Sequence, residues 1–287
     1  ISLIQIFYLI NQIFDWKSEK FWVSFVWEKE GKWSIMEILK VDNLSIQFGG
    51  LRAVDQFEIT VNDNELVGLI GPNGAGKTTI FNLLTGVYAP TEGEIYVNGT
   101  STKNKKPNEI VKLGSSRTFQ NIRLFKDMSV LDNIRIAYHN RMSYGLIASV
   151  FKTSKFKKQE AESIAVARNL LDIFGMGEFE NHLAKNLPYG KQRKLEIARA
   201  LATDPKILLL DEPAAGMNPQ ETEELMETIK FIKEKFEVSV LLIEHDMKLV
   251  MGICERIVVI DYGKIIAKGT PQEIRTNKNV IKAYLGE

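Results

Sequence analysis

The nine residues GPNGAGKTT at 71–79 place a glycine-rich turn between a short apolar run and a helical pattern. Their spacing matches G-x-x-x-x-G-K-[ST], with Gly71, Gly76, Lys77 and Thr78 at the fixed positions. In such a loop the glycines let backbone N–H groups turn toward phosphate oxygens, the lysine reaches the terminal phosphates and the threonine hydroxyl holds a magnesium ion. The helix that follows directs its positive end at the same anion. We therefore predict a phosphate-binding loop, against the alternative of a chance glycine-rich turn.

Composition and charge narrow the classes of protein that this chain can belong to. With 287 residues, of which 45% are apolar, the chain can bury the core of one large domain or two modest ones. The net charge of +1 gives no general argument for binding nucleic acid or a membrane surface. Cys254 is the only cysteine, so a disulfide within the chain is excluded and a reducing cytosolic setting fits.

The first 35 residues differ from the rest, because all four tryptophans of the chain lie there. Their apolar opening is shorter than the roughly 20 residues that span a bilayer, and it lacks the features of a signal peptide. A strand pattern, MEILKVDNLSIQF, begins at Met36. We expect residues 1–35 to be an extension outside the fold, such as translated upstream sequence. An amphipathic anchor at a membrane surface is the alternative.

Apolar runs and helical patterns alternate along the rest of the chain. Residues 38–61 alternate as half-buried strands around a turn at Gly49-Gly50, and buried strands are predicted at 66–70, 206–212 and 238–246. A helical period dominates 126–175, where we interpret the lysine-rich segment FKTSKFKKQE as a solvated helix face; contact with anionic lipid is the alternative. The alternation predicts an α/β fold with a largely parallel central sheet.

Polar residues that suit phosphate chemistry follow two of the predicted strands. The carboxyl ends of parallel strands are where such sheets carry their chemistry, and Asp211, Glu212, His245 and the loop at 71–78 all fall there. Asp211 can hold magnesium opposite Thr78, and Glu212 can orient or deprotonate an attacking water. For Glu212 the structural alternative is an acid near a helix N-terminus, before Pro213. His245 can bond the γ-phosphate through a neutral imidazole.

Beyond the phosphate loop, the stretch NLPYGKQRKLEIARALATDPKILLLDEPAAGMNP at 186–219 resembles the ATP-binding subunits of ABC transporters. The resemblance runs from about Met36 to Glu287, so 36–287 is the implied ATP-binding domain. It implies an α/β P-loop ATPase cassette with a RecA-like core, an antiparallel β subdomain and a helical subdomain at about 121–190. It also implies that the chain hydrolyses ATP with Mg²⁺ as cofactor.

Several positions match the functional residues of this family in the family's order. Phe48 matches the aromatic residue that stacks on adenine, and Gln120 in RTFQN matches the glutamine that links magnesium to the membrane subunits. The implied catalytic residues are Glu212, His245 and Lys77, and the implied metal ligands are Thr78, Gln120 and Asp211. The implied nucleotide-binding residues are Phe48, Gly71, Pro72, Asn73, Gly74, Ala75, Gly76, Lys77, Thr78, Thr79 and Gln120. The implied signature, which contacts ATP bound on the partner subunit, is Leu187, Pro188, Tyr189, Gly190 and Lys191.

Two positions depart from the common pattern of the family. The common signature is Leu-Ser-Gly-Gly-Gln, whereas here Pro188 replaces the serine and Tyr189 the first glycine. Proline offers neither a hydroxyl nor an N–H to a phosphate, while Gly190 and the following helix N-terminus can still face one. Asn218 stands where many relatives have aspartate. Both departures resemble features of one subgroup of this family, the ATPase subunits of branched-chain amino acid importers.

The segments RTFQNIRLFKDMSVLDNI, DEPAAGMNP, IEHDMKLVMGI and VIKAYLGE resemble, more narrowly, the branched-chain amino acid importers of bacteria. The resemblance implies a peripheral subunit on the cytoplasmic face of the inner membrane. The implied partners are a second, different ATPase subunit in a heterodimer, two membrane permease subunits and, indirectly, an external substrate-binding protein, with no nucleic acid. The helical segment 126–175 would be the lobe that docks on the permease. Urea and short-amide importers have similar subunits and are the alternative.

Two rival classes remain for comparison. A soluble ABC protein that acts on ribosomes or DNA usually carries two tandem cassettes or long coiled coils, and the sequence has neither pattern. A regulatory module that holds ATP without hydrolysing it is disfavoured because Glu212 and His245 are both present.

Overall fold

The computed structural model describes residues 25–27 and 33–285. The chain divides into two compact units, Ile1–Met36 and Glu37–Glu287. In the described part of the first unit, β1 (Phe25–Trp27) pairs antiparallel with β2 (Trp33–Ile35). The rest of the predicted extension, 1–24 and 28–32, lies outside the described residues.

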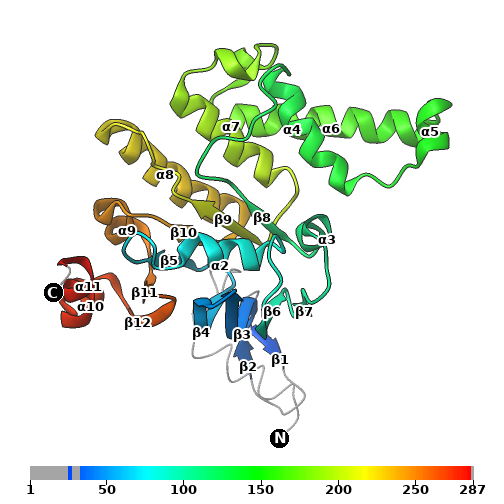
Figure 1. Cartoon of the computed structure of the whole chain (residues 1–287). Helices are drawn as coiled ribbons and strands as arrows, with labels where there is room; N and C mark the ends of the chain where they lie inside the picture. The colour runs from blue at the N-terminus through cyan, green and yellow to red at the C-terminus, as the bar shows by residue number, and fades with distance from the viewer. Residues whose placement is uncertain (1–24, 28–32, 286–287) are drawn as a thin grey trace, which may run out of the picture. The chain divides into compact units, whose positions relative to one another are not determined.

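A six-stranded sheet forms the centre of the second unit (Figure 1). In sheet order, its strands are β12 (Lys264–Gly269), β11 (Arg256–Asp261), β5 (Leu66–Ile70), β10 (Ser239–Ile243), β9 (Ile207–Asp211) and β8 (Ser115–Arg117). All neighbours in the sheet are parallel except β12, which is antiparallel to β11. Every residue of β5, β9 and β10 is buried, which explains why these strands are continuous apolar runs. The predicted α/β class is confirmed.

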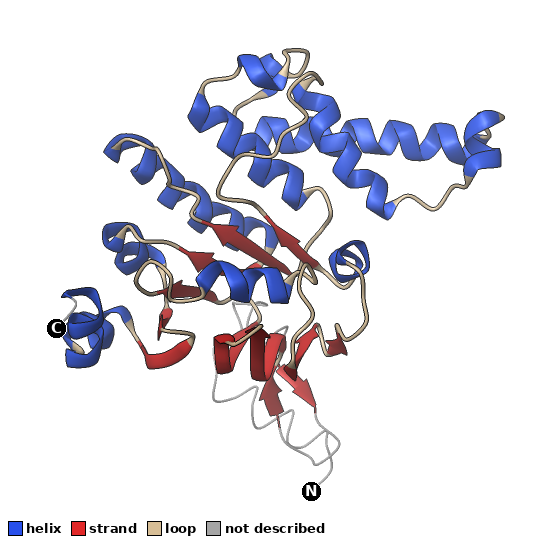
Figure 2. Ribbon diagram, viewed as in Figure 1, coloured by secondary structure: helices blue, strands red, loops and turns tan. Residues whose placement is uncertain are grey.

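Helices pack around these parallel strands (Figure 2). They are α2 (Lys77–Leu84), α3 (Pro107–Lys112), α8 (Pro219–Phe236), α9 (Met247–Ile253), α10 (Pro271–Thr276) and α11 (Lys278–Leu285). Leu225 of α8 and Leu249 of α9 join one apolar core with strand residues such as Leu208 and Leu242. The core therefore fixes where each strand ends, and with it the loops that follow.

A second sheet has four antiparallel strands, in the order β4 (Leu51–Asn62), β3 (Glu37–Phe48), β6 (Glu92–Val97) and β7 (Thr100–Ser101). β3 and β4 turn at Gly49-Gly50, where Gly49 has a φ of 57°, a left-handed conformation that favours glycine. In β4 the burial alternates from Phe57 to Asn62, which matches the half-buried pattern of the sequence. In β3 adjacent residues are buried together at 38–39 and 44–46, so strict alternation does not hold there.

Between β8 and β9 the described chain is helical. It contains α4 (Val130–Tyr138), α5 (Leu146–Val150), α6 (Ser154–Ile173), α7 (Tyr189–Leu201) and three 3₁₀ turns at His139–Arg141, Gly177–Phe179 and Ala184–Asn186. Helices α4, α6 and α7 contact one another in one group (Figure 1). Of the helices in the part of the chain that the structure describes, none has the length and hydropathy of a membrane span.

Candidate active site

The loop at 71–76 leads from β5 into α2 and is shaped by two glycines with neighbours too close for a side chain. A Cβ on Gly71 would lie 2.1 Å from the carbonyl oxygen of Ile260. Gly76 has a φ of 105°, and its Cβ would lie 2.9 Å from the carbonyl oxygen of Ala53. Because no side chain fits at these two positions, backbone groups form the surface of the loop there. A phosphate-binding loop requires such an exposed backbone.

Lys77 is the first residue of α2 and is buried, with 7% of its surface exposed. Its ammonium donates hydrogen bonds to the carbonyl oxygens of Gly71, at 2.6 Å, and Pro72, at 2.9 Å. Burial lowers the pKa of Lys77, and the nearby charges of Glu212 and Asp211 oppose that shift. Thr78 follows on the helix and is exposed. The charge of the lysine is thus held over the loop, beside two carboxylates.

Asp211 is the last residue of β9 and is buried beside the Arg117 side chain, to which the sequence analysis gave no role. The Arg117 guanidinium of β8 donates from Nη2 to Asp211 Oδ2 at 2.6 Å, with both side chains at most 6% exposed. Arg117 also donates to Asn82 Oδ1 at 2.8 Å, so it joins α2, β8 and β9. Its only sequence signal was its place in RTFQN, three residues before Gln120.

Glu212 comes together with two other predicted residues. Gln120 Nε2 donates to Glu212 Oε2 at 2.6 Å, although the two residues are 92 positions apart. His245 Nδ1 lies 3.8 Å from the same Oε2. Glu212 has a φ of 45°, which is uncommon for a residue with a side chain and is concentrated at functional sites.

Glu244, directly before His245, is a second residue that sequence analysis did not assign. Its side chain is fully buried and accepts hydrogen bonds from the backbone N–H groups of Ala214, at 2.7 Å, and His245, at 3.0 Å. Burial raises the pKa of Glu244, while these N–H groups oppose the shift. The carboxylate thereby ties the segment after Glu212 to the segment that carries His245. The sequence signal was an acid at the end of a fully apolar strand.

The signature residues surround the start of α7. Leu187 is buried, Pro188 precedes the first helical residue, and Gly190 is half-buried near Glu221. The Tyr189 hydroxyl donates to the carbonyl oxygen of Ala215 at 2.8 Å. Lys191 Nζ lies 4.6 Å from the ring centre of Phe179. The tyrosine that replaces glycine in the signature therefore contacts the chain just after Glu212.

Asn218, the other departure from the family pattern, begins α8. Its Oδ1 accepts from the Glu221 N–H at 2.9 Å, and the Glu221 carboxylate accepts from the Asn218 N–H at 3.0 Å. Asparagine and aspartate cap helices about equally well. Asn218 in place of aspartate therefore preserves the N-terminal cap of α8.

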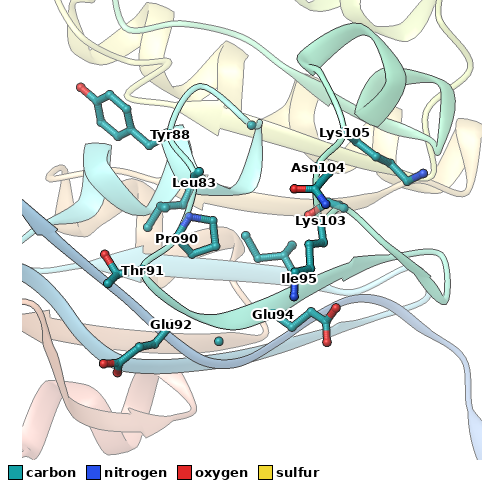
Figure 3. A pocket seen from close by; sticks show the side chains of 14 residues that line it. Leu83, Tyr88, Pro90, Thr91, Glu92, Glu94, Ile95, Lys103, Asn104 and Lys105 are labelled. Carbon is teal, nitrogen blue, oxygen red and sulfur yellow. The ribbon is translucent and has the colours of Figure 1, made fainter.

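Phe48, at the end of β3, is 44% exposed, and its ring centre lies 5.3 Å from that of Tyr88 in an edge-on contact. Tyr88 lines a cavity of about 360 Å³, together with Thr91, Glu94 and Lys103 (Figure 3). None of the predicted site residues lines this cavity. A different cavity, also of about 360 Å³, borders the phosphate loop and is lined by Pro72, Asn73, Gly74, Ala75, Asp261, Tyr262, Lys282 and Ala283.

The oxygen groups near the loop can hold a hard cation. Thr78 offers an exposed hydroxyl, Asp211 a carboxylate and Gln120 the carbonyl oxygen of an amide whose nitrogen bonds Glu212. No group of three or more His, Cys, Asp or Glu side chains suited to a metal occurs within 25–27 and 33–285. Mg²⁺ needs no such cage, because one or two carboxylates and substrate phosphates usually hold it.

Comparison with known proteins agrees with this geometry. Residues 54–215 match the family model described as ABC transporter, and residues 264–287 match the model described as branched-chain amino acid ATP-binding cassette transporter. The high-affinity branched-chain amino acid transport ATP-binding protein BraF of Pseudomonas aeruginosa is 49% identical over 250 residues, which cover 87% of this chain and 98% of the relative. The corresponding protein LivG of Escherichia coli K12 is 48% identical with the same coverage.

Solved structures give the same result. A crystal structure of the ADP conformation of an ATP-binding cassette of an ABC transporter superposes with a TM-score of 0.76 and 32% sequence identity. The match covers 88% of this chain and 100% of the other. The chain therefore belongs to the ABC transporter family, within the group of branched-chain amino acid transport ATP-binding proteins.

Proposed function

We propose that this chain is the ATP-hydrolysing subunit of an importer for branched-chain amino acids. The observation that carries this proposal is the meeting of Gln120, Glu212 and His245 at the ends of parallel strands, beside the phosphate loop and Lys77. A general base, a positioning amide and an imidazole beside a phosphate cradle are the groups that hydrolysis of a phosphoanhydride needs.

In the proposed mechanism the phosphate loop and Lys77 bind the nucleotide. The lysine ammonium donates to the carbonyl oxygens of Gly71 and Pro72 and can transfer these hydrogen bonds to the terminal phosphates. Backbone N–H groups at the start of α2 add the positive end of the helix dipole. Phe48 supplies the aromatic face for the adenine.

Thr78, Asp211 and Gln120 are the residues that would hold Mg²⁺. When bound, the ion neutralises charge that develops on the phosphates. Arg117 fixes the direction of the Asp211 carboxylate through their 2.6 Å contact. The same contact balances the charge of Asp211 until the ion is bound.

Glu212 is the proposed general base. Gln120 bonds Oε2 of its carboxylate, which leaves Oε1 to accept a proton from the attacking water. His245 is 60% exposed and faces the same carboxylate, so it can bond the γ-phosphate while staying aligned with the base. Glu244 holds the backbone of His245 in place.

The proposed assembly is a dimer of ATPase subunits on two membrane permease subunits, at the cytoplasmic face of the inner membrane. In a heterodimer, the signature at 187–191 would contact ATP on the second, different ATPase subunit. The helical segment 126–175 would dock on the permease, and an external binding protein would deliver the amino acid. Closure of the dimer on ATP would switch the gate.

Transport in proteoliposomes tests the substrate. We expect vesicles that hold the assembled transporter and its binding protein to accumulate labelled leucine, isoleucine and valine when ATP is supplied, and not when ADP replaces it. Unlabelled urea and acetamide should not compete, because the proposal commits to branched-chain amino acids. ATP-driven uptake of urea instead would replace the substrate class while leaving the ATPase role intact.

A shortened chain that begins at Met36 tests the proposal that residues 1–35 lie outside the fold. We expect this chain to fold, bind ATP and assemble, because Glu37–Glu287 form a compact unit by themselves. The measurement is thermal unfolding together with ATP binding. A melting temperature lower by ~5 °C or more, about the effect of 1–2 kcal/mol on a domain of this size, would show that the extension stabilises the domain.

A further inference from the structure

Three residues on one face of α7 contact two loops of the proposed hydrolysis site. Tyr189, Arg193 and Glu196 are spaced by four and then three positions, so they share one side of the helix. The first loop, 119–123, carries Gln120. The second, Pro213–Gly216, directly follows Glu212.

Arg193 and Glu196 hold the first loop by its backbone. The Arg193 side chain is fully buried; it donates from Nη1 to the carbonyl oxygen of Phe119 at 2.7 Å and from Nη2 to that of Gln120 at 2.8 Å. It also pairs with Glu196 at 2.8 Å, and Glu196 accepts from the Arg123 N–H at 3.2 Å. A guanidinium directs its donors in a rigid fork, so the pair fixes both ends of the loop.

Tyr189 holds the second loop. Its hydroxyl donates to the carbonyl oxygen of Ala215 at 2.8 Å and accepts from Arg193 Nη2 at 3.3 Å. A Cβ on Gly216 would lie 3.7 Å from this hydroxyl, so the phenol packs directly on the loop. The Arg193 guanidinium therefore connects the loop 119–123, which carries Gln120, with the loop Pro213–Gly216, which it reaches through the Tyr189 hydroxyl.

We propose that Tyr189 and Arg193 are positioning residues that keep Gln120 against Glu212 and couple the signature segment of this chain to its own hydrolysis site. The inference rests on the proposed function. Tyr189 and Gly190 open α7, so any displacement of the signature by the partner's nucleotide moves Arg193 on the same rigid helix. Through its two carbonyl contacts that movement reaches Gln120, and through Tyr189 it reaches the residues after Glu212.

The principal test is Tyr189→Phe, which deletes one hydroxyl from a side chain that is 41% exposed. In the assembled transporter we expect kcat for ATP hydrolysis to fall about two- to tenfold, the effect of one lost hydrogen bond on a barrier. The KM for ATP should stay within about twofold, and the Hill coefficient for ATP should fall. Without nucleotide, amide hydrogen exchange of the isolated chain should speed up at 214–217.

Tyr96→Phe is the matched control, because the Tyr96 hydroxyl also makes one short hydrogen bond, to Glu94 at 2.6 Å, in the antiparallel sheet. It should leave kcat and amide exchange at 214–217 unchanged. Arg193→Lys is the second variant; it should speed exchange at 119–123 and lower kcat at a similar KM. In the double variant, kcat should fall by less than the product of the two separate fold-changes, because both residues act in one hydrogen-bond network.

Three results would overturn the inference. Tyr189→Phe could keep the normal kcat and Hill coefficient. It could raise KM at constant kcat, which would mean that the Tyr189 hydroxyl serves only to bind the partner's nucleotide and positions nothing in its own subunit. It could lower the melting temperature while kcat per folded molecule stays normal, which would mean a structural role only. Glu212→Gln run in parallel separates the two proposals, since full turnover in that variant would instead remove the proposed function.

Discussion

We expect the replacement of Glu212 by glutamine to lower steady-state ATP hydrolysis by roughly 10²-fold or more, the upper part of the range for loss of a general base, and to leave ATP binding intact. Glutamine has nearly the shape of glutamate, and its amide can still meet Gln120 and His245, which lie 2.6 Å and 3.8 Å from Oε2 in the native chain. It cannot accept a proton from water. The loss should therefore appear in turnover and not in affinity.

Phosphate release from the assembled transporter measures the turnover, and equilibrium binding of a fluorescent ATP analogue measures the affinity. The matched control is Glu234→Gln, which makes the same chemical change at an exposed position near the end of α8. It should behave as the native chain does. Near-normal hydrolysis in Glu212→Gln would remove Glu212 from the catalytic role and leave it as an acid near a helix N-terminus.

We expect the replacement of Lys77 by alanine to weaken ATP binding itself, by roughly thirtyfold or more, because removal of one partner from a buried charged contact costs about 2–5 kcal/mol. The ammonium is the cation that the structure places on the loop, bonded to the carbonyl oxygens of Gly71 and Pro72. In the complex it would pair with the β- and γ-phosphates. Hydrolysis is expected to fall with the affinity.

Isothermal titration with ATP and Mg²⁺ gives the dissociation constant of the Lys77→Ala chain. Thermal unfolding without nucleotide must accompany it, because the two loop carbonyls also lose their donor. Lys40→Ala is the control: Lys40 is a half-buried lysine with a 44% exposed side chain, and it pairs with Asp42 at 3.1 Å in the antiparallel sheet. An unchanged affinity in a folded Lys77→Ala chain would contradict the phosphate-loop interpretation.

Local patterns were enough to predict the secondary structure around the site. The strands at 66–70, 207–211 and 239–243 were readable because burial on both faces demands unbroken apolar runs. The helix at 77–84 followed from the loop spacing. The rule that parallel sheets carry chemistry at strand ends then placed Asp211, Glu212 and His245 together.

Buried charges were not predicted, because a charged residue in a sequence is by default a surface residue. Arg193 and Glu196 are fully buried, and nothing in KQRKLEIAR distinguishes them from the exposed charges beside them except their three-residue spacing. Arg117 and Glu244 were hidden in the same way. Each is stable inside the fold because its hydrogen-bond partners come from distant segments.

The sequence by itself predicted the phosphate-loop spacing, the buried strands beside it and the family. All three depend on residue types at short, regular spacings, which act through local backbone geometry and burial. Only the tertiary structure decided that Gln120 bonds Glu212 across 92 positions, that Arg117 holds Asp211 and that Tyr189 reaches Ala215. These contacts depend on how the ends of β8, β9 and β10 and the start of α7 meet in space, and no short-range spacing encodes that meeting.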